Sequence, residues 1–594
     1  MRVVTDFLED FLRVYEFDRF RLDPSERRLF HAGAPIAVTP KALDTLIALV
    51  ENAGNLLHKE VLHKLLWPDT FVEDVTLARN ISDLRAVLSR HSAAKYIETV
   101  SKHGYRFIGE VQLIENADTI SANSEPMIAV LPFVPFDNDS TVEILGDGLA
   151  EEIIHALSCF SGLKVAARGS CFRFRGPAPD LRKIAADLGT DFIVQGSIRR
   201  MDSRFRVTAQ LIEAKRLTVR WSEQFERDVG DFIEIQDSIA KAIVAELKPR
   251  LGQSNLEIGP PRHSPQTDAW HSLWEGRLHQ HRFTPDSLAH AESCFEKAIR
   301  LDPGYALAYL GIAESQHIKA NLGFARPTDA LPKAADAISK ALLLGSNSGE
   351  VHAAAGVNAV FWRYDWVGAE LHFGRAFALS PSSSSVHHVY ALWWLRPQGR
   401  LEEAIYENRQ ALALDPLSSF LRIVQAYLLY LAGNEREAVS LCEAALSFDA
   451  QSYLGHRILG HIWQGQGKIH EANRAYAMAV DLPGSSPIDL GYLAASCALI
   501  GDTDKAVRIG NQLAESLDRG YLPPTIMAVL NLGAGRLGQV NRWVGKAIDE
   551  HDPNIFGLAT DPLWMAMKGS PEYRAALARI GLGMKGSRVS GSGW

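Results

Sequence analysis

The feature that most constrains the fold is a recurrence of small residues in the second half of the chain. These residues are Ala291, Ala334, Ala369, Ala404, Ala438, Ala472, Ala506 and Val540. The intervals between consecutive members are 43, 35, 35, 34, 34, 34 and 34 residues. Seven positions after each stands a second small or aliphatic residue: Ala298, Ala341, Ala376, Ala411, Ala445, Ala479, Leu513 and Ala547. A 34-residue period accommodates one pair of helices, and small residues let two helices pack closely. The spacing therefore predicts an all-α solenoid over residues 267–580.

Aromatic residues and prolines in this region recur at about the same spacing as the small residues. An aromatic residue follows the first small residue by four positions at Phe295, Phe373 and Tyr476, and prolines close several units. The pattern is similar to the tetratricopeptide repeat (TPR). That resemblance implies a concave groove, which either receives a protein or peptide partner or belongs to a plain spacer or oligomerisation scaffold. The first interval of 43 residues predicts an insertion in a longer loop around residues 321–329.

A second informative segment covers residues 68–107. Its apolar residues Leu77, Ile81, Leu84 and Leu88 form one stripe at the helical period, which predicts a helix over residues 76–88. Arg79 lies almost opposite this stripe, beside other polar residues. Such a face can enter the major groove of DNA. After the helix, residues 97–100 and 105–107 form a predicted β-hairpin with Lys102 and His103 at its tip.

A helix followed by a basic hairpin is the layout of a winged helix. On this basis the candidate DNA-binding residues are Thr76, Arg79, Asn80, Ser82, Arg85, Lys102, His103 and Arg106. Between residues 76 and 106 there are six lysines and arginines against two acidic residues, which places positive charge where phosphates would lie. The alternative is a surface helix in a module that docks protein. Motif and charge together favour DNA.

The preceding segment supports the same interpretation. Strand-like runs at residues 15–22, 27–30 and 35–38 lead into predicted helices at 41–51 and near 58–66. Together with the turn at Leu66-Trp67-Pro68, the Val72-Glu73-Asp74 segment and the wing motif Gly104-Tyr105-Arg106-Phe107, residues 13–112 resemble the OmpR-type winged-helix family. The run Asn80-Ile81-Ser82-Asp83-Leu84-Arg85 resembles its CadC/ToxR branch.

Between these regions, residues 127–250 alternate strand and helix patterns, which predicts an α/β domain flanked by linkers at 113–126 and 251–266. The motifs at residues 129–133, 146–149 and 195–199 resemble a TolB-like amino-terminal domain, a module that accompanies DNA-binding or cyclase domains. We expect a helix over residues 149–159 with Asp147 as its cap. A phosphate loop and a nucleophile elbow are absent from the sequence, so catalytic residues are not expected.

Composition narrows the function further. The net charge of −8 argues against coating nucleic acid along the whole chain, so DNA binding should be local. The five cysteines form no CxxC pair, and we expect idle thiols rather than a metal site, with a Cys159–Cys171 redox switch as the alternative. Acidic residues in the first eleven positions and the lack of a long apolar run predict a cytoplasmic protein without a membrane span.

The sequence thus predicts a multidomain chain: a winged helix-turn-helix, then an α/β domain, then an all-α TPR solenoid, and a disordered tail at 581–594. The expected function is one-component transcription regulation without cofactor or metal. The expected partners are double-stranded promoter DNA, RNA polymerase, a protein or peptide in the TPR groove, and a second copy of the chain. The alternatives are a TPR adaptor whose winged helix docks protein, and a nucleotide cyclase-like enzyme.

Overall fold

The computed structural model divides the chain into two compact units, residues 1–124 and 125–594. It describes residues 13–582, except 24–27, 32–33, 37, 39, 67–73, 93, 101–102, 116–124, 137–139, 161, 177–178, 202–203, 229–231, 248–266, 345–347 and 520. The expectations for the amino-terminal residues 1–11, for Trp67-Pro68, for most of both linkers and for nearly all of the tail lie outside the described residues.

The N-terminal unit opens with an antiparallel sheet in the order β4-β3-β2-β1-β8. Its strands are β1 (Arg13–Phe17), β2 (Phe20–Asp23), β3 (Arg28–His31), β4 (Ala34–Ile36) and β8 (Gln112–Glu115). The single strand predicted over residues 15–22 is wrong. The chain reverses at Asp18, whose φ of 54° lies in the left-handed region that aspartate tolerates, so the run forms the hairpin β1–β2.

The helices of this unit are α2 (Pro40–Glu51), α3 (Lys59–Leu66) and α4 (Asp74–Ser89), close to their predicted bounds. A second sheet, in the order β5-β7-β6, holds β5 (Leu56–His58), β6 (Ile97–Val100) and β7 (Gly104–Phe107). The strand β8 was not predicted. Because β8 pairs with β1 from Arg13↔Glu115 to Glu16↔Gln112, a cut at residue 112 would remove a strand of the first sheet.

In the second unit, the α/β segment contains a mixed sheet in the order β11-β9-β12-β13-β14, with β10 (Val134–Pro135) also paired to β12. The strands are β9 (Met127–Val130), β11 (Lys164–Val165), β12 (Phe192–Met201), β13 (Arg204–Glu213) and β14 (Thr218–Asp228). The pairs β11–β9 and β9–β12 are parallel, and β12–β13–β14 are antiparallel. The α/β architecture is confirmed.

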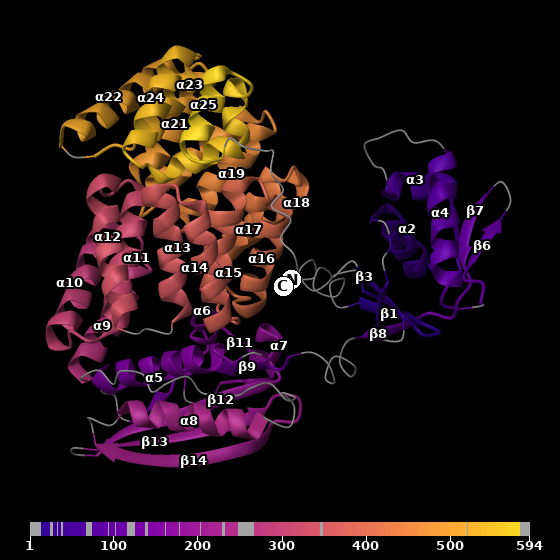
Figure 1. Cartoon of the computed structure of the whole chain (residues 1–594), viewed down its shortest axis with the longest axis horizontal. Coiled ribbons are helices and arrows are strands. Elements are labelled where there is room, and N and C mark those ends of the chain that lie inside the picture. The colour runs from indigo at the N-terminus through magenta and orange to yellow at the C-terminus, as the bar shows by residue number, and fades with distance from the viewer. Residues whose placement is uncertain are drawn as a thin grey trace. The chain divides into compact units, whose positions relative to one another are not determined.

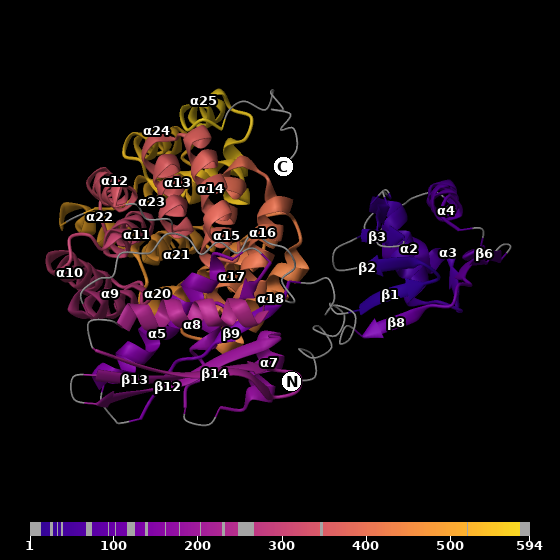
Figure 2. The same ribbon diagram turned by 60° about the horizontal axis from the view of Figure 1, so that its bottom comes forward.

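Alternate residues of β9 face two different cores, as its continuous apolar sequence predicts for a central strand. Ile128 and Val130 pack with α5 (Ser140–Ser158) and α8 (Phe232–Leu247), which lie side by side on one face of the sheet (Figure 2). Ala129 faces the other core, which includes α7 (Leu181–Leu188), while α6 (Arg168–Cys171) is a single short turn.

Helix α5 begins at Ser140, nine residues before the predicted start, and runs through Gly146, Asp147 and Gly148. The interpretation of Asp147 as a helix cap is therefore wrong. Its carboxylate instead accepts two hydrogen bonds from Arg175, of 2.9 and 2.5 Å. Gly148 reflects close packing, because a Cβ there would lie 2.4 Å from the ring of Trp270.

The solenoid consists of helices that coil in chain order from α9 to α25 (Figure 1). They are α9 (Thr267–Gln280), α10 (Pro285–Leu301), α11 (Ala306–Leu322), α12 (Pro327–Leu343), α13 (Gly349–Arg363), α14 (Trp366–Leu379), α15 (Ser384–Tyr390), α16 (Leu401–Leu414), α17 (Ser419–Leu431), α18 (Glu435–Phe448), α19 (Tyr453–Gly465), α20 (Ile469–Asp481), α21 (Pro487–Leu499), α22 (Thr503–Arg519), α23 (Pro524–Gly533), α24 (Leu537–Asp549) and α25 (Pro571–Arg579). The repeating small residues occupy the second helix of each pair and, except for the half-buried Ala506, are buried.

The inserted loop predicted around residues 321–329 is wrong. Only residues 323–326 separate α11 from α12, and these two helices have 17 residues each. Most later helices of the array have 13 or 14. The additional residues of the 43-residue interval therefore lengthen helices instead of forming a loop, which sequence spacing alone does not distinguish.

The α/β segment and the start of the solenoid share one hydrophobic core. Trp270 and Trp274 of α9, with Phe295 of α10, pack in the same cluster as the residues of α5 and α8. Polar contacts extend this interface: Ser170 donates a 2.5 Å hydrogen bond to Asp415, and Arg277 pairs with Glu151 at 3.1 Å. Removal of the solenoid by truncation of the chain at residues 251–266 would therefore expose this core to water.

The carboxyl-terminal turns close the solenoid back on its earlier helices. These turns are η5 (Pro553–Ala559) and η6 (Pro562–Met567), where Phe556 stacks on Phe361 with ring centroids 5.9 Å apart. The side chain of Asn554 donates a 3.1 Å hydrogen bond to the carbonyl of Asn321. These contacts join segments that lie about 200 residues apart in the sequence. The carboxyl-terminal turns thereby partly enclose the inner side of the array.

Candidate nucleic-acid interface

The helix α4 has the two faces that its sequence predicts. Leu77, Ile81, Leu84 and Leu88 are all buried in the core of the N-terminal unit. On the opposite side Thr76, Arg79 and Ser82 are exposed. Arg79 forms no ion pair with any residue in the described part of the chain, and its exposed side chain lies on the face that would meet a base edge.

Asn80 does not belong to this exposed face, and its assignment as a DNA contact is contradicted. Its side chain is buried against α2, where the amide donates 3.3 and 3.4 Å hydrogen bonds to the hydroxyl of Thr45 and the carbonyl of Lys41. A step of 100° from Arg79 brings Asn80 to the border of the apolar stripe. It therefore positions α4 on α2.

Arg85 connects α4 to the wing. Its Nη2 donates hydrogen bonds to the carbonyl of Ile97 at 3.0 Å and to the hydroxyl of Thr99 at 2.7 Å. Both partners lie on β6, the first strand of the wing. The predicted site residue Arg85 thus fixes the hairpin relative to the helix, and its contact with DNA stays a prediction.

The wing brings Arg106 opposite Glu98, its partner in the β6–β7 register, with Nη1 and Oε2 3.3 Å apart. His103 lies exposed at the turn, where its backbone carbonyl accepts a hydrogen bond from the amide of Lys59. The predicted contact Lys102 is outside the described residues. A phosphate near the wing would therefore meet an arginine that is already paired.

This pairing gives a prediction for the wing. The charges of Glu98 and Arg106 cancel in their ion pair, so the pair should make no net contribution to phosphate binding. The double variant Glu98→Gln/Arg106→Gln should then bind DNA with the wild-type dependence on salt. Arg106→Gln alone should bind more weakly, because Glu98 then repels phosphates. Titrations between low and moderate salt measure the slope of log K against log salt, which changes by about 0.9 for each phosphate contact. A slope reduced by about one in the double variant would make Arg106 a direct phosphate contact.

A second candidate site lies inside the solenoid, where alternate helices from α11 to α23 and the turns η5 and η6 line a cavity of about 710 Å³. This volume lies within the range of small-molecule sites. Its lining combines aromatic and charged side chains, among them Trp393, Tyr427, Arg457, Phe420, Glu314 and Asp561. The repeat pattern predicts a groove but not its partial enclosure, which depends on long-range contacts of the carboxyl-terminal turns.

Burial determines the charge state of groups in this cavity. It lowers the pKa of His388 and His461 to about 4, so both imidazoles are neutral at pH 7. Burial also raises the pKa of Glu314 to about 7, although nearby Arg277 opposes this shift. Arg457 remains paired with buried Asp489 at 3.4 Å. The cavity therefore presents neutral imidazole rings beside charged groups, of which Arg457 is paired with Asp489.

The cysteines do not form a disulfide, since all five are free thiols. Burial raises the pKa of Cys171 to about 12, which disfavours the thiolate that a redox switch requires. The alternative of a Cys159–Cys171 switch gains no support from this position. No helix in the described part of the chain combines the length and apolar character that crossing a membrane requires.

Two family models match the chain. Residues 33–107 match the family described as "Transcriptional regulatory protein, C terminal", and residues 123–242 match the second domain of HilA/YgeH-like transcriptional regulators. The winged-helix domain and its link to transcription regulation are thereby confirmed. For the middle segment the matching description is HilA/YgeH-like, and the TolB-like resemblance stays a prediction.

Curated relatives match longer segments of the chain. The transcriptional regulator HilA of Salmonella typhimurium is 24% identical over 436 residues, which cover 72% of this chain and 75% of HilA. A protein of Rhizobium meliloti called putative adenylate cyclase 3 is 33% identical over 190 residues, 32% of each chain, so the match spans about a third of that relative's length. The DNA-binding domain of Escherichia coli CadC aligns at 24% identity over 17% of this chain and 96% of its own, with a TM-score of 0.16.

Proposed function

We propose that this chain is a one-component transcription regulator in which α4 reads promoter DNA and the solenoid receives the controlling signal. The observation that carries the proposal is the exposed polar face of α4, where Arg79 has no ion pair with a described residue, in the segment that matches a transcriptional regulatory family. Such a protein acts where the chromosome lies, which in a bacterium is the cytoplasm.

In this proposal Arg79 contacts base edges, and Thr76 and Ser82 flank it on the same face. Arginine presents a planar fork that bonds guanine at two positions, the commonest specific contact in the major groove. Arg85 holds the wing at a fixed distance from this helix, so the hairpin with His103 and Lys102 can follow the neighbouring backbone. Base contacts then specify the sequence, and the wing supplies position.

The solenoid is the proposed sensor because it offers a partly enclosed cavity with both aromatic and charged groups. A bound molecule or peptide end would contact helices from many repeats at once. The same solenoid packs against the α/β segment through Trp270 and Trp274 of α9. A change of shape in the cavity would reach the α/β segment at Glu350, which lines the cavity and lies 3.7 Å from His155 of α5. RNA polymerase and a second copy of the chain remain the proposed output partners.

Catalysis is not part of this proposal, despite the name of the Rhizobium meliloti relative. A nucleotide cyclase needs carboxylates free to hold a metal ion and a cradle for the nucleotide. The candidate carboxylate Asp147 is occupied by Arg175, whose guanidinium also contacts Glu143 at 3.4 Å. Cyclic nucleotide formed by the purified chain from ATP or GTP with Mg²⁺ or Mn²⁺ would overturn this assignment.

The division of labour between the two units gives a testable expectation. Residues 1–124 and the whole chain, expressed separately in a strain that lacks the gene, should occupy the same genomic sites. Only the whole chain should change transcription of the neighbouring genes, because residues 1–124 lack the proposed sensor. Chromatin immunoprecipitation and transcript measurements give the two readouts. The cut at residue 124 keeps β8 and the core of the N-terminal unit intact.

Two outcomes would contradict this account. An unchanged transcriptional effect with residues 1–124 would make the solenoid a scaffold. Capture of proteins by residues 1–124 without occupancy of DNA would favour the rival adaptor, in which the winged helix docks protein.

A further inference from the structure

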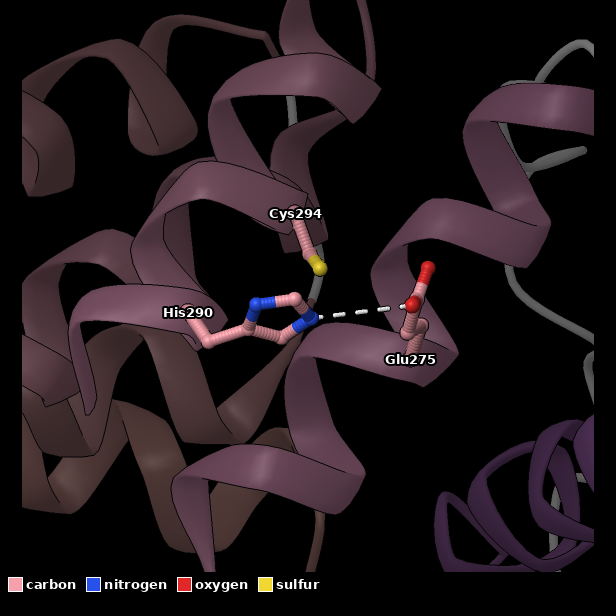
Figure 3. Close-up of side chains that lie close together, drawn as sticks. All are labelled: Glu275, His290 and Cys294. Carbon is pink, nitrogen blue, oxygen red and sulfur yellow. Dashed lines mark ion pairs between the residues drawn. The ribbon is translucent and has the colours of Figure 1, made fainter. Parts of the chain in front are cut away.

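The first helix pair of the solenoid brings together three side chains that bind transition metals. Glu275 lies on α9, and His290 and Cys294 lie on the facing helix α10 (Figure 3). One ligand atom from each lies within 4.8 Å of the other two, and His290 Nε2 is 3.7 Å from Glu275 Oε1. Among the residues that the structure describes, this is the only such group of three.

The backbone explains why these side chains meet. His290 and Cys294 are four residues apart, so both project from the same face of α10. Gly276 follows Glu275 and permits α9 to approach closely, since a Cβ there would lie 2.5 Å from the ring of Phe295. The closely packed pair thereby directs Glu275 toward the two donors of α10. The spacing of His290 and Cys294 is visible in the sequence, but the approach of Glu275 from the neighbouring helix is not, so this site was not predicted.

A fourth donor lies beside the cluster. His279 is four residues after Glu275 on α9, and its ring centroid is 4.1 Å from that of His290. Each helix therefore contributes two donors at a spacing of four. A surface ion pair between Glu275 and His290 would explain only one contact of this arrangement, and it would add little stability at side chains that are 37% and 52% exposed.

We propose that Glu275, His290 and Cys294 bind a zinc ion, with His279 or water in the fourth position. The donor set selects the metal, because thiolate and imidazole favour Zn²⁺ over Mg²⁺ or Ca²⁺, which prefer oxygen ligands. A zinc ion requires donors about 2.0–2.3 Å away, so the exposed His290 side chain must move inward by a small rotation. As the zinc–sulfur bond forms, the thiol proton of Cys294 leaves to solvent.

The ion would connect α9 to α10 beside an important interface. Trp274, one residue before Glu275, packs in the core shared with the α/β segment, and Arg277 pairs with Glu151. Zinc would therefore stiffen the helix pair that joins the solenoid to the α/β segment. The inference is independent of DNA binding, because either property can be present without the other.

The test uses the full chain, kept reduced with a phosphine, stripped by a chelator and desalted. Titration with Zn²⁺ in a calorimeter should show a site of one ion per chain. Titration with Co²⁺ should give a thiolate-to-cobalt charge-transfer absorbance and the intense visible bands of a tetrahedral site. Cys294→Ala should abolish the charge-transfer band, whereas the control Cys159→Ala should keep it.

His290→Ala and Glu275→Gln should each weaken Zn²⁺ binding by at least about tenfold. Loss of a residue that only holds a ligand in place already weakens metal binding by about that factor, so loss of a ligand should cost at least as much. The exposed histidine His470, changed to alanine, is the matched control and should leave the affinity unchanged. Because His290 is exposed, its variant should fold, as circular dichroism will verify. Wild-type affinity in His290→Ala, or a charge-transfer band that survives Cys294→Ala, would overturn the proposal.

Discussion

The variant Trp270→Ala should lose about 3–5 kcal/mol of stability, the usual range for removing a large aromatic side chain from a packed core. Trp270 is only 3% exposed, and its ring fills the space beside Gly148 of α5. It therefore joins α9 to the α/β segment. Since whole domains are stable by about 5–15 kcal/mol, this loss is a large share of the total. Chemical denaturation of the full chain, followed by circular dichroism, measures it.

The shared core also predicts the form of this transition. Sheet and helix signals of residues 125–594 should be lost together, and at lower denaturant than in the wild type. Leu371→Ala serves as the control, because Leu371 is 73% exposed and its removal should change stability by less than about 0.5 kcal/mol. A sheet transition that is unaffected by Trp270→Ala would mean that the α/β segment folds independently of the solenoid.

The variant Arg79→Ala should lose about 1–3 kcal/mol of binding free energy on the specific DNA site, or roughly 5-fold to 150-fold in Kd. The reason is that Arg79 is exposed on α4, unpaired among the described residues, and opposite the buried stripe. The loss on random duplex DNA should be smaller, since random DNA offers phosphates but no matching base edge. Fluorescence anisotropy with both duplexes gives the two constants.

Arg79→Lys separates charge from geometry. Lysine keeps the positive charge but lacks the planar fork, so this variant should retain binding to random DNA and still lose affinity for the specific site. Equal losses of Arg79→Ala on the two duplexes would reduce Arg79 to a phosphate contact and remove base reading from its role.

Periodicity predicted most of the architecture because burial enforces it. The stripe of α4 and the small residues of the repeats are positions where one wrong side chain would disrupt packing, and nearly all of them are buried. The features that were missed depend on contacts between distant segments. The strand β8 pairs with β1, which lies about 100 residues earlier in the chain, and the local sequence pattern does not predict that pairing.

The candidate site shows the same division. Angular position on a helix predicted the exposure of Thr76, Arg79 and Ser82. It did not predict that Asn80 bonds to Thr45 of α2, because a border position can face either a neighbouring helix or solvent. The pairing of Arg106 with Glu98 required the strand register of the wing. Counting charges along the sequence therefore overstated the positive charge available to DNA.

The central claim is tested most directly by selecting DNA from a random pool with residues 1–124 and, separately, with the whole chain. Both should enrich the same sequence, and the Arg79→Ala form of residues 1–124 should lose that enrichment while it remains folded. The account is contradicted if neither protein enriches any sequence over the pool, or if the Arg79→Ala form enriches the same sequence as the wild type.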